Sequence, residues 1–272
     1  MKFTKMQGIG NDYIYVDCFR EKVDHPSQVA RFVSDRRFGI GGDGLILICP
    51  SGKADCRMEM YNADGSQGAM CGNGIRCVGK YVYDHGLIPE ERETLTVETA
   101  SGIRTLSIYK HQENGRMKAE ALTVDMGKAL LTSKLPEPIQ VAGRQLEFVG
   151  VNVGNPHAVY FVDQADQVDL EKLGPFFEHH PRFQPDRVNS EFVQVLDRTH
   201  IRMRVWERGS GETWACGTGA TASVYACILT GRTEDQVTVS LTGGDLQIRL
   251  DRDSGHLFMT GPAVEVFTGN ID

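Results

Sequence analysis

Two segments far apart in the chain, residues 57–62 and 201–207, alternate between polar and apolar side chains. Such a period of two predicts β-strands with one buried face. A polar, glycine-rich loop follows each strand, and the pattern then changes to that of a helix. Apolar residues recur at helical spacing from Ile75 onward. Residues 218–230 carry no charge at all, which is typical of a helix buried on all sides.

Both segments belong to an internal repeat with a constant offset. The sequence Cys-Gly-Asn-Gly at residues 71–74 aligns with Cys-Gly-Thr-Gly at residues 216–219, and Gly86 aligns with Gly231. The differences 216 − 71 and 231 − 86 both equal 145. The two single glycines stand where a helix ends in a left-handed residue. The chain is therefore predicted to contain the same strand and helix order twice.

The remaining pattern completes a fold prediction. Further strands are expected at residues 12–18, 45–49, 94–109, 119–126, 145–153, 158–163, 191–196 and 236–250, with helices at 26–36 and 169–178. We predict an α/β (α+β) fold of two pseudo-symmetric lobes. Each lobe is a strongly curved, mostly antiparallel sheet around one central helix, and the active site is expected in the cleft between the lobes. The lobes are residues 1–116 and 117–262, and the tail 263–272 returns to the first lobe as a spare strand.

Composition narrows the class of protein. The 272 residues are 40% hydrophobic and 24% charged, which is ordinary for a globular chain of about two domains. A net charge of -7 argues against a broad nucleic-acid surface. No apolar run approaches the length of a membrane span, and no secretory signal is recognisable at the N-terminus. Seven scattered cysteines indicate free thiols, so a cytoplasmic location is expected.

The duplicated cysteines suggest a specific chemistry. Each precedes a Gly-x-Gly that opens a helix, where the helix dipole lowers the pKa of a thiol. Unpaired N–H groups there can also bind a substrate carboxylate. Equivalent residues of related lobes would face each other, so one sulfur could remove a Cα proton while the other protonates the opposite face. The two thiols would share one proton, and the scheme needs neither a metal nor pyridoxal.

Other features receive simpler interpretations. The cysteines outside the repeat are read as small buried hydrophobic residues; they are Cys18, Cys49, Cys56, Cys77 and Cys227. Residues 39–44 fit the dinucleotide fingerprint GxGxxG, but a helical pattern precedes them and a strand pattern follows. The fingerprint requires the reverse order, so nucleotide binding is not expected.

At these residues the chain closely resembles the diaminopimelate epimerase family. The resemblance is carried by Gly8-Ile-Gly-Asn-Asp12, Asn62-Ala-Asp-Gly-Ser66, Cys71-Gly-Asn-Gly-Ile-Arg-Cys77, Gly154-Asn-Pro-His157, Arg187-Val-Asn189 and Glu207-Arg-Gly-Ser-Gly-Glu-Thr-Trp-Ala-Cys-Gly-Thr-Gly219. It implies a cofactor-independent isomerase that interconverts LL- and meso-diaminopimelate on the route to lysine and peptidoglycan. It also implies a homodimer that acts on a zwitterionic amino acid, with no nucleic-acid or membrane partner.

The resemblance also implies roles for individual residues. Cys71 and Cys216 are the base and the acid, and His157 and Glu207 tune protonation near the thiols. Donors for the reacting carboxylate are supplied at the helix starts by Gly72, Asn73, Gly217 and Thr218. The distal amino-acid end is held by Asn62, Asn155, Asn189 and Arg208, with Glu207 near its ammonium, while Asn11 lines the cleft. Some members carry a binding Gln in the loop where this chain has Gly42-Asp43-Gly44, so a side-chain contact to substrate is not expected there, and any contact at Gly44 must come from its backbone.

Two alternatives remain open at this point. A proline- or hydroxyproline-type racemase on the same scaffold would also use two cysteines, but its substrate lacks the distal carboxylate for Arg208. A thiol redox or metal-binding protein would use the same cysteines without inverting a carbon centre.

Overall fold

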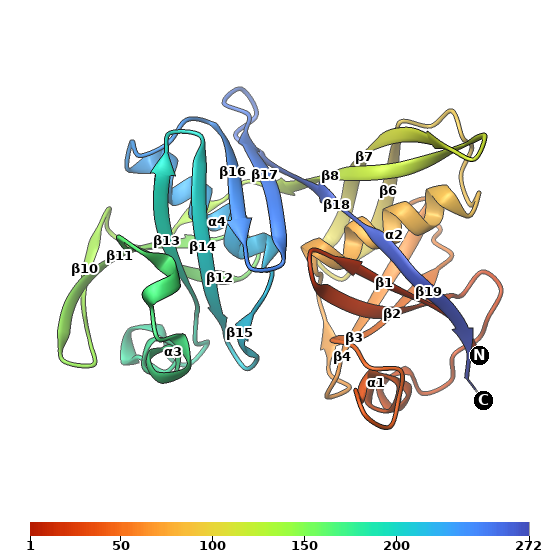
Figure 1. Ribbon diagram of the computed structural model, residues 1–272, viewed down its shortest axis with the longest axis horizontal. Helices are drawn as coiled ribbons and strands as arrows, with labels where there is room; N and C mark the ends of the chain where they lie inside the picture. The colour runs from red at the N-terminus through yellow and green to blue at the C-terminus, as the bar shows by residue number, and fades with distance from the viewer. Residues whose placement is uncertain (272) are drawn as a thin grey trace. The chain divides into compact units, whose positions relative to one another are not determined.

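The computed structural model describes residues 1–271, which form two compact units (Figure 1). Unit 1 comprises Met1–Val124 together with the chain from Thr260 onward, and unit 2 comprises Asp125–Met259. The chain changes unit inside two strands, β8 (Arg116–Gly127) and β18 (Leu257–Pro262). The boundaries expected from the sequence, 116/117 and 262/263, lie a few residues away from these two positions. A hydrophobic pattern marks the ends of a strand and does not show that one strand is shared by two units.

Unit 1 is a mixed sheet with two helices. Its elements are β1 (Lys2–Gly8), β2 (Asn11–Asp17), α1 (Pro26–Ser34), β3 (Gly44–Cys49), β4 (Cys56–Asn62), β5 (Gln67–Gly68), α2 (Gly72–Asp84), β6 (Thr94–Thr99), β7 (Gly102–Glu113), the first part of β8, and β19 (Val264–Asn270). Strands β2 and β3 are parallel, as are β4 and β6. The pairs β1–β2, β3–β4, β6–β7 and β7–β8 are antiparallel. The segment 39–44 lies between α1 and β3, the reverse of the dinucleotide-binding order.

Unit 2 repeats this order. Its elements are β9 (Leu130–Leu131), β10 (Glu137–Val141), β11 (Arg144–Asn152), β12 (Pro156–Phe161), α3 (Leu170–Glu178), β13 (Asn189–Asp197), β14 (His200–Glu207), β15 (Gly211–Thr213), α4 (Gly217–Leu229), β16 (Gln236–Leu241), β17 (Gly244–Leu250) and β18, with short 3-10 helices at Ala165–Gln167 and Pro181–Phe183. The parallel pairs are now β12–β13 and β14–β16, and the neighbouring pairs are again antiparallel. The predicted fold of two repeated, mostly antiparallel halves is confirmed.

The helix that follows each cysteine forms the centre of its unit. Eleven of the 13 residues of α2 are buried. Helix α4 carries no charge and packs against β11, β12, β13, β14, β16 and β17; Figure 1 shows it behind several of these strands. Gly86 and Gly231 follow the two helices with φ of 69° and 68°, as a left-handed helix end requires. Each sheet therefore holds its helix start, and the cysteine there, in a fixed position.

The tail forms one more strand of unit 1. Strand β19 pairs antiparallel with β1, with Phe3 opposite Gly269. Strand β1 itself was not among the expected strands, nor were β10 and β18.

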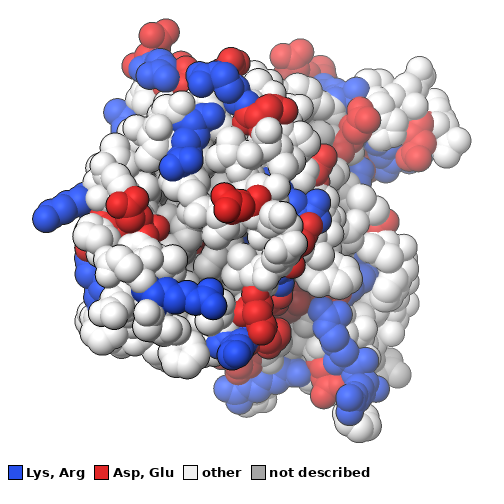
Figure 2. All heavy atoms as spheres, turned by 60° about the vertical axis from the view of Figure 1, so that its left-hand side comes forward, with Lys and Arg blue, Asp and Glu red and all other residues white. Residues whose placement is uncertain are grey.

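Within the described residues, no helix is long and apolar enough to cross a membrane. Figure 2 shows acidic and basic side chains interspersed over the face that it displays.

Gly174 allows α3 to approach the indole of Trp206. A Cβ atom built on Gly174 would lie 2.1 Å from Cδ2 of this rigid ring. Alanine normally favours a helix interior over glycine, but here we expect Gly174→Ala to lower the free energy of unfolding by about 1–3 kcal/mol through overpacking. Urea denaturation followed by circular dichroism measures this change. Gly52→Ala is the control, because no atom lies within 4 Å of its added Cβ; equal stability of the two variants would contradict the prediction.

Candidate functional site

Cys71 caps the N-terminus of α2. Its Sγ accepts a hydrogen bond from the Gly74 N–H at 3.3 Å and donates one to Asn11 Oδ1 at 3.2 Å. The second glycine of the motif is needed here, because a Cβ on Gly74 would lie 2.8 Å from Ile46 Cδ1. Glycine at this position therefore lets the first helical turn close onto the sulfur without displacing the Ile46 side chain.

Cys216 occupies the same position at the start of α4. Its Sγ accepts from the Gly219 N–H at 3.3 Å, and the hydroxyl of Thr218 lies 3.6 Å away. A Cβ on Gly219 would lie 2.8 Å from Oε1 of Glu191 and 3.1 Å from the sulfur. The two helix starts thus share one geometry, but a carboxylate lies beside the second one.

The electrostatic surroundings of Cys216 differ from the expectation. Burial raises the pKa of Cys216 well above its ordinary value, and the carboxylates of Glu207 and Glu191 raise it further. The contacts from Thr218 and the Gly219 N–H act in the opposite direction but are outweighed. The predicted lowering of the pKa at a helix start is therefore wrong for Cys216. In the free protein this sulfur is a thiol.

The glutamate beside this thiol, Glu191, is buried together with a histidine of unit 2. His157 on β12 is 1% exposed, and its Nδ1 lies 2.6 Å from Oε1 of Glu191 on β13, which is fully buried. The other ring nitrogen, Nε2, lies 2.9 Å from Oδ1 of Asn155. Because a carboxylate only accepts, the His157 Nδ1 donates to Glu191. The structure thereby brings two predicted residues, His157 and Asn155, into direct contact, and it adds Glu191, which the sequence analysis missed, on the other side of the His157 ring.

Glu207 lies at the end of β14, and its carboxylate accepts a hydrogen bond from the hydroxyl of Thr213. Removal from water raises the pKa of Glu207, against the opposing effects of the Thr213 and Cys216 side chains and of the nearby His157 ring. A carboxylate beside a thiol can accept the proton of the thiol and return it. Glu207 thus lies close enough to affect Cys216, and its role in tuning protonation there stays a prediction.

The loop after Glu207 is held by another predicted residue. Asn189, at the start of β13, accepts from the Arg208 N–H through Oδ1 at 3.0 Å. The Arg208 guanidinium donates to the carbonyl of Asp186 at 2.7 Å. Asn189 therefore fixes the backbone from which Arg208 extends.

Unit 1 brings a smaller set together. Asn11 contacts Cys71, and its amide Nδ2 donates to Asp43 Oδ2 at 2.7 Å, which orients the amide. Asn62 Nδ2 donates to the Ser66 hydroxyl at 3.0 Å. Asn73 is 1% exposed, and its side chain accepts from the Arg76 guanidinium at 2.9 Å. The side chain of Asn73 thus supports the helix start, and a contact to ligand from this position would come from its backbone.

Gly44 cannot carry a side chain in this structure. A Cβ there would lie 2.2 Å from the carbonyl oxygen of Tyr61 and 2.8 Å from the ring of Tyr13. Its backbone pairs with both neighbouring strands, opposite Tyr13 and Asn62. Steric exclusion therefore explains why no side chain at this position can contact a substrate.

The comparison with known protein families decides the class. The family model described as diaminopimelate epimerase matches residues 3–132 and 149–266. The chain belongs to the diaminopimelate epimerase family. A diaminopimelate epimerase of Agathobacter rectalis is 52% identical over 290 residues, which cover 100% of this chain and 99% of that protein. The resemblance inferred from the motifs is confirmed, as is the expectation of an isomerase.

Solved structures with the same fold have far lower sequence identity. A phenazine biosynthesis protein of the PhzF family from Bacillus anthracis has a TM-score of 0.74 at 17% identity, covering 100% of this chain and 98% of that one. A hydroxyproline epimerase from Agrobacterium vitis also has a TM-score of 0.74, at 15% identity, covering 99% and 91%. At such low identity these structures show only that the fold is shared. Any inference about the substrate therefore rests on the residues around the cysteines.

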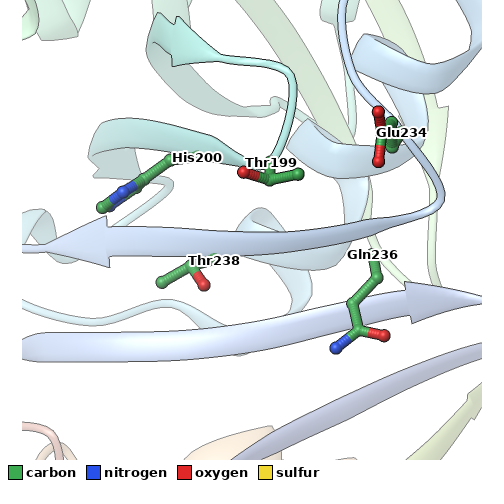
Figure 3. Close-up of a pocket in the computed structure, with 5 residues that line it drawn as sticks. All are labelled: Thr199, His200, Glu234, Gln236 and Thr238. Carbon is green, nitrogen blue, oxygen red and sulfur yellow. The ribbon is translucent and has the colours of Figure 1, made fainter.

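A hollow elsewhere on unit 2 has a different character. Figure 3 shows its lining residues, Thr199, His200, Glu234, Gln236 and Thr238, around the ends of β14 and β16. His200 Nε2 already lies 2.8 Å from the Ser240 hydroxyl. None of the predicted site residues lies in this hollow, and the candidate site remains at the two helix starts.

Proposed function

We propose that this protein is a cofactor-independent diaminopimelate epimerase in which Cys71 and Cys216 act on opposite faces of one Cα. The observation that carries the proposal is the duplicated helix start. In each unit a cysteine sulfur accepts a hydrogen bond at 3.3 Å from the N–H three residues on. A helix start stabilises a thiolate and also a carboxylate on which charge develops. Membership of the family indicates diaminopimelate as the substrate.

The proposed reaction is two proton transfers through a carbanion. A thiolate takes the Cα proton, and the electron pair left behind delocalises into the substrate carboxylate. The opposite thiol then donates its proton to the other face of the same carbon. Cys216 is the better resting proton donor, because two neighbouring carboxylates and burial raise its pKa. Cys71, which donates to Asn11 in the resting protein, becomes the thiolate by releasing its proton to solvent, and the Gly74 N–H and the start of α2 then stabilise that thiolate.

The proposed substrate contacts account for the polar residues around the cysteines. Backbone N–H groups of Gly72, Asn73, Gly217 and Thr218 would bind the reacting carboxylate. The distal carboxylate would contact Arg208, whose guanidinium can bind it through two donors. The distal ammonium would contact Glu207 and side-chain oxygens of the asparagines. A proline-type substrate has no distal carboxylate for Arg208 to bind. We further propose that the protein acts as a homodimer in the cytoplasm, where its seven free thiols stay reduced.

Isotope exchange tests this function. The reduced enzyme is incubated in deuterated water with LL-diaminopimelate and no added cofactor, and the products are analysed by NMR and chiral chromatography. We expect meso product carrying deuterium at one Cα, because the donating thiol carries a solvent deuteron. L-Proline and trans-4-hydroxy-L-proline are run in parallel and should remain unlabelled. Labelled proline, or no label in diaminopimelate, would contradict the proposal.

A further inference from the structure

Glu191 is a buried carboxylate that the proposed proton transfers do not use. It is 0% exposed on β13. Its Oε1 accepts from His157, and its Oε2 has no hydrogen-bond partner within residues 1–271. A buried carboxylate with one unsatisfied oxygen opposes folding. Its presence therefore indicates a role other than stability.

The repeat shows that the fold does not need a carboxylate at this position. Ile46 of unit 1 is the counterpart of Glu191, since 191 − 46 equals the repeat offset of 145. Ile46 Cδ1 lies 2.8 Å from the place of a Cβ on Gly74, and Glu191 Oε1 lies 2.8 Å from the place of a Cβ on Gly219. An apolar side chain thus fills the same space beneath α2 that the carboxylate fills beneath α4.

The residue that pairs with Glu191, His157, also has a different counterpart in unit 1. His157 lies opposite Asn189 in the β12–β13 ladder, where Tyr13 lies opposite Gly44 in the β2–β3 ladder. The pair of tyrosine and isoleucine in unit 1 has thus become a pair of histidine and glutamate in unit 2. The titratable groups that face this pair are Tyr160 on β12, Glu207 on β14 and Cys216 before α4.

We propose that Glu191 is a positioning residue for the epimerisation and acts through His157. By accepting from Nδ1 at 2.6 Å, Glu191 holds a proton on that nitrogen. This leaves Nε2, on the Asn155 side, as the nitrogen that exchanges a proton with the site. The inference rests on the proposed function, because its catalytic effect is defined for the two-thiol reaction.

The test uses Glu191→Ile, which copies unit 1, together with Glu191→Gln and Glu191→Asp. We expect the isoleucine and glutamine variants to fold and to lose about 10²–10⁴-fold in kcat with KM little changed, as happens when a histidine loses its orienting carboxylate. The pH profile of kcat should change shape in both variants, because a carboxylate no longer holds the proton on His157 Nδ1. The aspartate variant should recover part of the activity, because it restores a carboxylate.

Asp17→Asn is the matched control for replacing a buried carboxylate. Asp17 is 8% exposed, accepts from the Phe19 N–H at 3.0 Å and lies outside the proposed site. It should change stability but neither kcat nor the pH profile. Native kcat and an unchanged pH profile in Glu191→Ile or Glu191→Gln would overturn the inference while native activity on diaminopimelate upholds the function. Absence of native activity would instead refute the proposed function.

A direct measurement on the native protein does not depend on whether the variants fold. Protein labelled with ¹⁵N-histidine is examined by NMR, and the His157 signals are identified by their loss in His157→Gln. We expect a proton on Nδ1, protected from solvent exchange by the bond to Glu191. An unprotonated Nδ1 would overturn the inference, whatever the activities of the variants.

Discussion

Alanine in place of either Cys71 or Cys216 is expected to lower kcat for epimerisation by at least about 10³-fold, within the range found for loss of a general acid or base. Each variant keeps one sulfur, so it should still exchange the Cα proton of one stereoisomer with solvent, slowly and without inversion. The two variants should select opposite stereoisomers. Proton exchange is followed by NMR in deuterated water, and inversion by chiral chromatography.

The second cysteine on each helix provides a matched control. Cys77 on α2 and Cys227 on α4 are both 0% exposed, and burial raises their pKa values to about 11 and about 12. Cys77→Ala and Cys227→Ala should therefore lose some stability and keep their activity. Substantial epimerisation by Cys71→Ala or Cys216→Ala would contradict a two-thiol mechanism. The same selectivity in both variants would contradict the assignment of opposite faces.

The repeat could be predicted from the sequence because its signals are local. Each of these signals restricts the residue types at a few neighbouring positions. The signals are a glycine with positive φ, a glycine packed against a side chain, and a helix without charges. Gly74 and Gly219 illustrate this, since each would clash with a side chain of the sheet if it carried a Cβ. Residue identity at these positions is favoured by the close packing of the helix start on the sheet, and two copies of this packing give two copies of the motif.

Strand β1 could not be predicted, because it depends on a contact that the pattern does not contain. Lys5 lies in its middle and is only 7% exposed, and its ammonium forms an ion pair with Asp12 Oδ2 at 2.6 Å. A lysine in a sequence is normally taken as a surface residue. Burial of Lys5 requires an acidic partner, and Asp12 on β2 provides it. The strand can therefore be recognised from the structure of the sheet and not from the sequence pattern.

The candidate site likewise combines features that are local in the sequence with features that depend on contacts between distant segments. The helix start beside Cys216 is a local feature, and the sequence predicted it. The direction of the pKa shift is set by burial and then by Glu207 and Glu191, which come from two other strands. Glu191 did leave one signal, because it is a single charge within the otherwise uncharged run from Val188 to Leu196. A charge inside a strand that is buried on both faces indicates a buried polar partner, which here is His157.

Glu207→Gln is expected to change turnover and thiol reactivity in opposite directions. Loss of the carboxylate removes a proton-exchange partner of Cys216, so kcat should fall by about 10²–10³-fold. The same change removes a negative charge that raises the pKa of Cys216. The pKa of this thiol therefore falls, more thiolate is present at pH 8, and alkylation of Cys216 by iodoacetamide should become faster. Peptide mass spectrometry of timed samples measures the rate at Cys216 alone.

Glu212→Gln separates this effect from a general loss of charge on the neighbouring strand. Glu212 lies on β15 and pairs with Arg204 at 2.8 Å. Its loss should leave both kcat and the alkylation rate of Cys216 near the native values. Slower turnover with slower alkylation in Glu207→Gln would mean that the substitution merely disturbs the loop around Arg208. Slower turnover with faster alkylation requires a carboxylate that acts on the sulfur electrostatically, because a disturbed helix start would stabilise the thiolate less.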